Sequence, residues 1–110
     1  MGADFVKLKV PYRQGRFDPA LLKEATQAAG TCGVLCEGGD KVDEAAFLKE
    51  LYAQIHEGGS RGNGTGRNIH QRPLEEAIAM ANAIYAITVE GATAEAAIAI
   101  AQTEKGKQCN

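Results

Sequence analysis

The chain has 110 residues, which is the size of a single domain. Hydrophobic residues make up 45% of it and charged residues 24%, as in ordinary globular proteins. The net charge is −2 with both signs interspersed, so we expect neither a nucleic acid nor a membrane surface as a partner. The sequence has no apolar run of the roughly 18 residues that a membrane span needs and no recognisable secretory signal, so we expect a cytoplasmic protein.

The three cysteines are Cys32, Cys36 and Cys109, and an odd number of this kind indicates free thiols in a reducing compartment. Cys32 and Cys36 would lie about 13 Å apart on one strand, which is too far for a disulfide. No second cysteine pair or pair of histidines completes a metal site. We therefore expect small, apolar thiols, and neither a metal nor another cofactor.

Short apolar segments alternate with helical patterns along the chain. A near-alternation of polar and apolar residues predicts a strand over residues 4–10, and a turn follows at residues 12–17. Asp18 and Pro19 are typical of the start of a helix, and Gly30 is typical of its end. This segment is the first predicted βα unit.

The same order is repeated in the next part of the chain. Residues 31–36 are almost wholly apolar, which predicts a strand covered on both faces, and a tight turn follows at residues 37–41. Asp43 can cap a second helix, which ends at residues 58–59. The composition of residues 60–66 is that of a flexible Gly-rich loop, but their place before another helix predicts a third strand.

Two helices and a tail complete the pattern. Residues 73–87 and 93–102 have helical periodicity, and residues 104–110 form a polar tail that we expect to fray. The order βα-βα-βαα predicts an α/β domain over residues 1–103, with a parallel sheet and right-handed crossovers. Three strands leave two open sheet edges, which predicts a homo-oligomer or a place in a larger assembly.

Two Gly-rich turns follow the second and third predicted strands, at the end of the sheet where ligands gather. Gly38 and Gly39 form one turn, and Gly66 and Arg67 form the other, just before a helix. Backbone N–H groups in such turns bind anions, and Arg67 would add a charge-assisted hydrogen bond. Each turn taken singly is ordinary turn chemistry, but the two on neighbouring strands predict a phosphate site.

Lys7 stands in the middle of the first predicted strand, between Val6 and Leu8. Either its side chain reaches water at the edge of the strand, or a pocket holds it away from water. In the second case, desolvation and the nearby Lys9 would favour the neutral amine, which attacks carbonyl groups to form a Schiff base. The residue pattern alone leaves both interpretations open.

Three segments carry a resemblance to a known family: GADFVKLKVP at residues 2–11, VLCEGGDK at 34–41 and GGSRGNGTGRNIHQ at 58–71. They resemble the last three βα units of the class I, Schiff-base fructose-bisphosphate aldolases of the archaeal and bacterial type, in the DeoC/LacD-like aldolase family. The likeness covers residues 2–90, and the GRNIHQ segment is its most specific part. It implies the C-terminal fragment of a (β/α)8 TIM barrel, completed by oligomerisation.

The resemblance also implies an activity and the residues that carry it. Lys7 matches the Schiff-base lysine on the sixth strand of the barrel. Gly38 and Gly39 match the turn after strand seven, and Gly66 and Arg67 match the turn after strand eight; these turns hold the substrate phosphate in the family. The implied reaction is the reversible carbon–carbon cleavage of a phosphorylated ketose.

Some features depart from the family pattern. Glu37 stands where many relatives have Ser, and a carboxylate at this position opposes phosphate binding. The N-terminal barrel units, which supply the general acid and base, have no counterpart; Tyr12 and His70 are candidates within this chain, whereas His56 is interpreted as structural. The alternative function is therefore a non-catalytic, oligomerising α/β module with a residual phosphate site, truncated relative to the aldolases.

Overall fold

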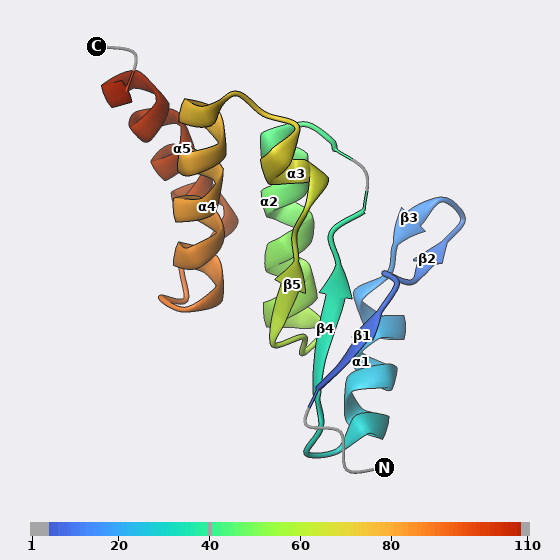
Figure 1. The fold of residues 1–110 in the computed structure, drawn as a ribbon. Coiled ribbons are helices and arrows are strands. Elements are labelled where there is room, and N and C mark those ends of the chain that lie inside the picture. The colour runs from blue at the N-terminus through green and yellow to red at the C-terminus, as the bar shows by residue number, and fades with distance from the viewer. Residues whose placement is uncertain (1–4, 40, 109–110) are drawn as a thin grey trace.

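A three-stranded parallel sheet organises the chain (Figure 1). The computed structural model describes residues 5–39 and 41–108. The sheet has the order β1-β4-β5, and a separate hairpin of two two-residue strands, β2 and β3, follows β1. The strands are β1 (Phe5–Leu8), β2 (Tyr12–Arg13), β3 (Arg16–Phe17), β4 (Gly33–Glu37) and β5 (Gly62–Gly64).

The helices follow the predicted order, and the chain turns from strand to helix three times. A short π-helical turn, η1, continues α2 without a break. The bounds are α1 (Pro19–Ala29), α2 (Glu44–Tyr52), η1 (Ala53–Glu57), α3 (Arg67–His70), α4 (Leu74–Thr88) and α5 (Ala94–Gln108). The predicted parallel βα units are therefore confirmed, with strands shorter than the predicted ranges.

Side-chain caps fix the starts of the first two long helices. Asp18 accepts a hydrogen bond from the N–H of Ala20 at 2.9 Å, and Pro19 opens α1 as expected. Asp43 accepts from the N–H groups that follow it in α2, the nearer being that of Ala45 at 3.1 Å. These bonds satisfy backbone donors that a helix cannot satisfy internally, which is why both helices begin at these residues.

The two faces of the sheet differ in what covers them. Val34 and Cys36 of β4 pack with Leu22 of α1, and Val6 and Leu8 of β1 lie against this cluster. In Figure 1, α1 and α2 lie behind the sheet, and the opposite face is turned toward the viewer. Since side chains alternate along a strand, Lys7 falls on this opposite, open face.

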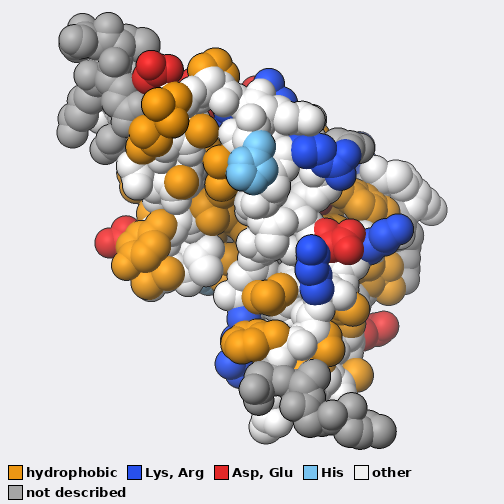
Figure 2. Space-filling view, in the orientation of Figure 1, with side chains coloured by type: hydrophobic (Ala, Val, Ile, Leu, Met, Phe, Trp, Pro, Cys, Tyr) orange, Lys and Arg blue, Asp and Glu red, His pale blue; other side chains and the backbone are white. Residues whose placement is uncertain are grey.

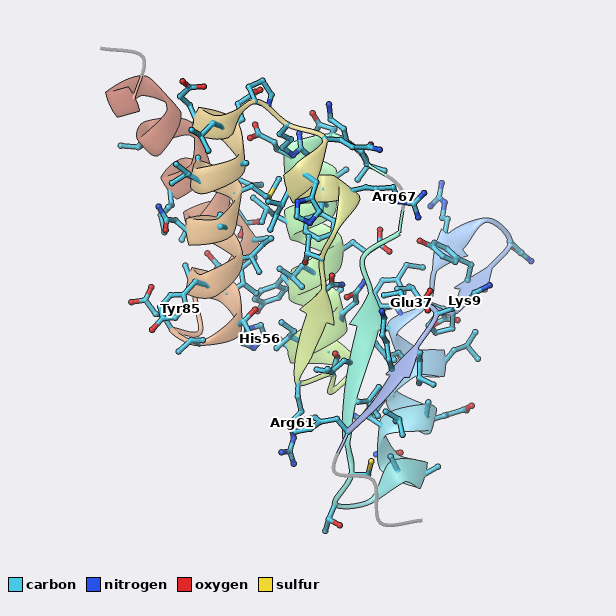
Figure 3. All side chains as sticks on the ribbon, viewed as in Figure 1. Lys9, Glu37, His56, Arg61, Arg67 and Tyr85 are labelled. Carbon is cyan, nitrogen blue, oxygen red and sulfur yellow. The ribbon has the colours of Figure 1, made fainter. Side chains whose placement is uncertain are left out.

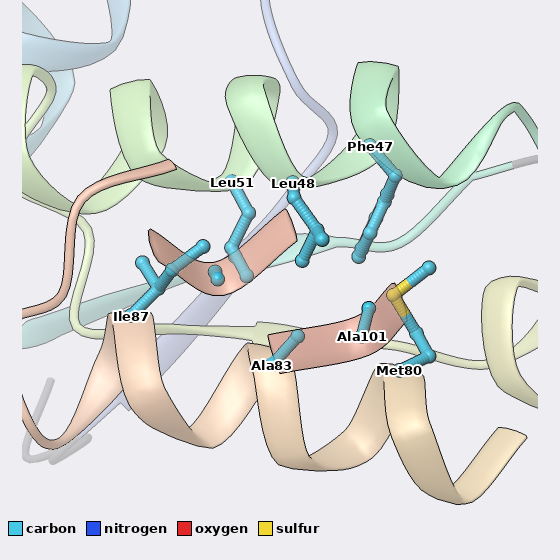
Figure 4. Close-up of a cluster of buried hydrophobic side chains, with 8 residues drawn as sticks. Phe47, Leu48, Leu51, Met80, Ala83, Ile87 and Ala101 are labelled. Atoms are coloured by element: carbon cyan, nitrogen blue, oxygen red, sulfur yellow. The ribbon is translucent and has the colours of Figure 1, made fainter. Parts of the chain in front are cut away.

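A second hydrophobic cluster joins the helices rather than the sheet (Figure 4). It lies between α2, α4 and α5, and small alanines on α4 and α5 let these two helices approach closely. Its buried members are Phe47, Leu48, Leu51, Met80, Ala83, Ile87, Ala97 and Ala101. Over the described part of the chain, no helix combines the length and the apolar character needed to cross a membrane.

The C-terminal end differs from the expected polar tail. The helix predicted over residues 93–102 is α5, and it continues to Gln108 instead of fraying from residue 104. Gln, Glu and Lys are good helix formers, so the polar composition of this segment does not end the helix. Residues 109–110, which include Cys109, lie outside the described residues.

Candidate functional site

The two predicted glycine turns meet at the C-terminal ends of β4 and β5. The N–H of Gly38 donates to the carbonyl oxygen of Gly64 at 3.2 Å, so the turn after β4 is bonded directly to the end of β5. Gly66 begins the next turn, and its carbonyl oxygen accepts the N–H groups of Ile69 and His70, both at 2.9 Å. Sequence reasoning placed these turns side by side, and the geometry agrees.

Gly38 has no room for a side chain. A Cβ at this position would lie 2.9 Å from the Cα atom of Thr65 and 3.0 Å from the carbonyl oxygen of Gly64. The neighbouring Gly39 has a φ of +69°, a conformation that side-chain-bearing residues rarely adopt. The Gly-Gly pair thus permits a close approach of two backbones and a left-handed turn, which together bring the β4 and β5 turns into contact.

Lys7 lies on the open face of the sheet, close to the end of β5. It pairs in register with Leu35 of β4, and its Nζ atom lies 3.8 Å from the position of a Cβ built on Gly64. Lys7 is exposed in this chain, so its side chain reaches water, which is the first of the two interpretations that the sequence left open. The physical reason is the open face: among the described residues, no helix packs over the side of β1 that carries Lys7.

Charged side chains gather near the same end of the sheet. Lys9 and the half-buried Glu37 line a cavity of about 410 Å³, together with both glycines of the β4 turn. Figure 3 places Arg67 at this end of the sheet and Arg61 at the other end. Figure 2 shows basic side chains on either side of an acidic one on this face. An anion in the cavity would therefore meet an opposite charge at Lys9 and like charges at Glu37 and Glu50, whereas Arg67 is not among the residues that line it.

The candidate bases differ in their surroundings. Tyr12 donates a hydrogen bond to Glu50 at 3.0 Å, and burial together with the Glu50 carboxylate raises the pKa of its phenol, which keeps it protonated. His56 lies 3.2 Å from the carbonyl oxygen of Ile87 and stacks on a neighbouring tyrosine, in agreement with its structural interpretation. His70 is exposed at the end of α3.

Cys36 is fully buried on the helix-covered side of β4, and burial raises the pKa of its thiol. This environment agrees with the predicted apolar role. Cys32 precedes β4 and is only half-buried. Both thiols are free in the structure.

Sequence reasoning missed Asn68, which is completely buried beside the two turns. Its side-chain amide donates to the carbonyl oxygen of Gly38 at 3.2 Å and accepts from the N–H of Val42 at 3.0 Å. The only sequence signal was its place directly after Arg67 in the GRN segment. An asparagine at a helix start is common, so this signal does not reveal the long-range bonds.

Comparisons with known proteins agree with this geometry. The family described as DeoC/LacD family aldolase matches residues 1–72. The fructose-bisphosphate aldolase/6-deoxy-5-ketofructose 1-phosphate synthase of Methanocaldococcus jannaschii is 54% identical over 101 residues, which are 91% of this chain and 32% of that protein. The solved structure of a fructose-bisphosphate aldolase from Slackia heliotrinireducens is 43% identical, with a TM-score of 0.85 over 94% of this chain and 33% of that one.

The shares of the relatives that the chain covers show that it corresponds to part of an aldolase. It spans about a third of the length of the proteins that it matches. Its parallel βα units are those of a TIM-barrel fragment, and the high identity rules out a likeness of fold alone. The chain belongs to the DeoC/LacD aldolase family.

Proposed function

We propose that this chain carries the nucleophile and the phosphate-binding turns of a Schiff-base aldolase that cleaves and forms a carbon–carbon bond in a phosphorylated ketose. Membership of the aldolase family supports the reaction class. The observation that carries the proposal is the position of Lys7 beside Gly64, whose carbonyl oxygen is bonded to the Gly38 turn. An amine nucleophile and two anion-binding turns therefore share one end of one sheet face.

The chemistry assigns a role to each group. The neutral amine of Lys7 attacks the ketose carbonyl, water leaves, and the resulting iminium accepts the electron pair of the breaking carbon–carbon bond. The N–H of Gly38 fixes its turn to Gly64, and Gly39, Gly66 and Arg67 hold the substrate phosphate and so place the carbonyl over the amine. Tyr12 is not assigned as the base that removes the hydroxyl proton, because its phenol donates to Glu50 and its pKa is raised by burial and by that carboxylate.

The site is open in this chain, so we infer that a second copy associates with it and covers the exposed sheet. Both outer strands, β1 and β5, have an unpaired edge within the described sheet. Hydrophobic side chains gather over α4 (Figure 2), where Tyr85 is 56% exposed, and Val89, directly after the helix, is 62% exposed. A cavity of about 350 Å³ separates this part of α4 from Gly62 of β5. Open strands and apolar helix surface of this kind favour association.

A second candidate function is a non-catalytic oligomeric module with a residual phosphate site. The exposure of Lys7 favours it, because the amine lies on an open sheet face and not in an enclosed site that could orient a carbonyl over it. The carboxylate of Glu37 beside the β4 turn also weakens any phosphate site there. The two functions share the fold and the turns, and they differ in whether Lys7 forms a covalent intermediate.

Reductive trapping decides between the two functions. The chain is incubated with fructose 1,6-bisphosphate and borohydride, which reduces an iminium to a stable secondary amine, and the intact protein is weighed by mass spectrometry. The proposal predicts an adduct on the native chain and none on Lys7→Met. Lys23→Met is the matched control, since Lys23 is exposed on α1, away from the open face. No adduct on the native chain, with a stable oligomer by light scattering, would establish the module instead.

A further inference from the structure

A buried asparagine connects the two glycine turns. We propose that Asn68 is a positioning residue: its side-chain amide sets the spacing between the β4 turn and the turn before α3, so that both contact the same phosphate group. The phosphate in this statement rests on the proposed function. The spacing itself rests on hydrogen bonds between described residues.

The bonds of Asn68 reach across the site in two directions. Its Nδ2 atom donates to the carbonyl oxygen of Gly38 at 3.2 Å, and its Oδ1 atom accepts from the N–H of Val42 at 3.0 Å. Gly38 and Val42 stand on either side of the loop that leads from β4 to α2. The Asn68 side chain, which follows β5, thus holds both ends of the β4–α2 loop.

The chemical nature of the partners requires an amide at position 68. Gly38 presents a carbonyl oxygen, which needs a donor, and Val42 presents an N–H, which needs an acceptor. A carboxylate would satisfy Val42 and leave the Gly38 carbonyl oxygen facing a negative charge. Because Asn68 is 0% exposed, water cannot replace a lost partner without opening the site.

Arg72 also bonds both segments, the β4–α2 loop and α3. Its Nη2 atom donates to the carbonyl oxygen of Val42 at 2.6 Å, and its Nε atom donates to the backbone carbonyl oxygen of Asn68 at 2.7 Å. A rigid guanidinium that bonds both backbones reduces the freedom of the β4–α2 loop. Asn68 and Arg72 together hold the loop at a fixed distance from α3.

The bonds of Asn68 affect the groups that would contact a phosphate. The N–H of Gly38 is already bonded to Gly64, so this group fixes the turn and is not aimed at a ligand in this conformation. In the proposed function, Gly39, Gly66 and Arg67 contact the phosphate, and Gly39 stands on the segment held by Asn68, between Gly38 and Val42. Loss of the Asn68 bonds would release the segment that carries Gly39 from α3, so that the two turns no longer hold a fixed spacing for one phosphate.

Hydrogen exchange measured by NMR tests the spacing without reference to activity. Asn68→Asp keeps the acceptor for Val42 and removes the donor for Gly38, whereas Asn68→Ala removes both. The Gly38 N–H is bonded to Gly64 and not to Asn68, so its exchange reports how firmly the turn is held; we expect it to exchange about tenfold faster in both variants, because the turn loosens when its carbonyl oxygen loses the Asn68 donor. The Val42 amide should accelerate only in Asn68→Ala. Asn82→Ala, on the exposed surface of α4, is the control and should change neither amide.

Trapping with dihydroxyacetone phosphate tests the consequence for phosphate. In both Asn68 variants, the half-saturating ketone concentration should rise about tenfold while the maximal rate of labelling of Lys7 stays unchanged, because Asn68 does not touch the lysine. Asn68→Ala carries no charge, so an effect shared by the two variants is not electrostatic. Loss of folding would instead lower the maximal rate as well and would be visible in the exchange of the Leu51 amide.

The two results separate the inference from the proposed function. Unchanged exchange at Gly38 in Asn68→Asp, or faster exchange with an unaltered half-saturating concentration, would overturn the positioning role. If the native chain is never labelled, the proposed function fails. In that case the exchange rates of the Gly38 and Val42 amides alone test whether Asn68 sets the spacing of the turns.

Discussion

The Nζ atom of Lys7 lies 3.8 Å from the position that a Cβ on Gly64 would occupy. The carbonyl oxygen of Gly64 accepts the N–H of Gly38, so this glycine is bonded to the β4 turn and also lies beside the lysine. The absence of a side chain at position 64 leaves space between the amine and the turns. This arrangement gives the glycines of β5 a role beyond turn formation, since the third strand carries little side-chain packing of its own.

Substituting Gly38 should cost stability through steric conflict. In Gly38→Ala the new methyl group would press on the backbone at Thr65 and Gly64, at 2.9 and 3.0 Å. We expect the free energy of unfolding to fall by about 1–3 kcal/mol, the usual cost of overpacking. Denaturant titration measures this change.

Gly64→Ala is the matched control for Gly38→Ala. Its Cβ would lie 3.5 Å from the Cε atom of Lys7, which is an ordinary van der Waals contact. We expect the free energy of unfolding to change by less than about 0.5 kcal/mol. Equal losses in the two variants would show that glycine is needed at both positions for reasons other than the close approach at Gly38.

The buried thiol of Cys36 should make the fold sensitive to alkaline pH. Burial raises the pKa of this thiol above its value in the unfolded chain. Its contribution to stability is therefore fully present below the ordinary thiol pKa of about 8.5 and is lost as the pH rises through the folded value. We expect the free energy of unfolding to fall less steeply above about pH 8.5 in Cys36→Ala than in the native chain.

Alkylation gives a second readout of the same burial. Iodoacetamide should modify the half-buried Cys32 in the folded chain, and it should modify Cys36 only after denaturation. Identical pH slopes for native and Cys36→Ala proteins, or labelling of Cys36 in the folded state, would show that this side of β4 opens to solvent.

The apolar surface of α4 should drive self-association. Replacing Tyr85 and Val89 together with serine removes the two most exposed hydrophobic side chains near the cavity beside β5. We expect the dissociation constant of the oligomer, measured by analytical ultracentrifugation, to rise at least about tenfold. Asn82→Ser, on the same helix, should leave it unchanged. A native chain that stays monomeric at every concentration would exclude the association.

Much of the fold was predictable because local chemistry determines it. Asp18 and Asp43 cap helices, and an aspartate directly before a helical pattern is a strong signal of a helix start. Apolar runs between such helices indicate buried strands. The hairpin at residues 12–17 was predicted only as a turn. Its Gln14 adopts a φ of +55°, which composition does not signal, because Asn, Asp and Gly are the usual residues in such turns.

The site was predictable in its position and not in its detail. The order of the units alone places Gly38 and Gly66 at one edge of the sheet. The exposure of Lys7 depends on which elements cover the open face, and no local pattern in this chain carries that information. The bond from Asn68 to Gly38 spans 30 residues of sequence, so it follows from the packing of two loops and from no single motif.

The central claim is that Lys7 and the two glycine turns form one site. The most direct measurement compares borohydride labelling of Lys7 by dihydroxyacetone phosphate and by dihydroxyacetone, each with and without inorganic phosphate. We expect the phosphorylated ketone to label Lys7 at a lower half-saturating concentration, and inorganic phosphate to compete with it while leaving labelling by dihydroxyacetone unchanged. Equal labelling by the two ketones, with no effect of phosphate, would contradict the claim.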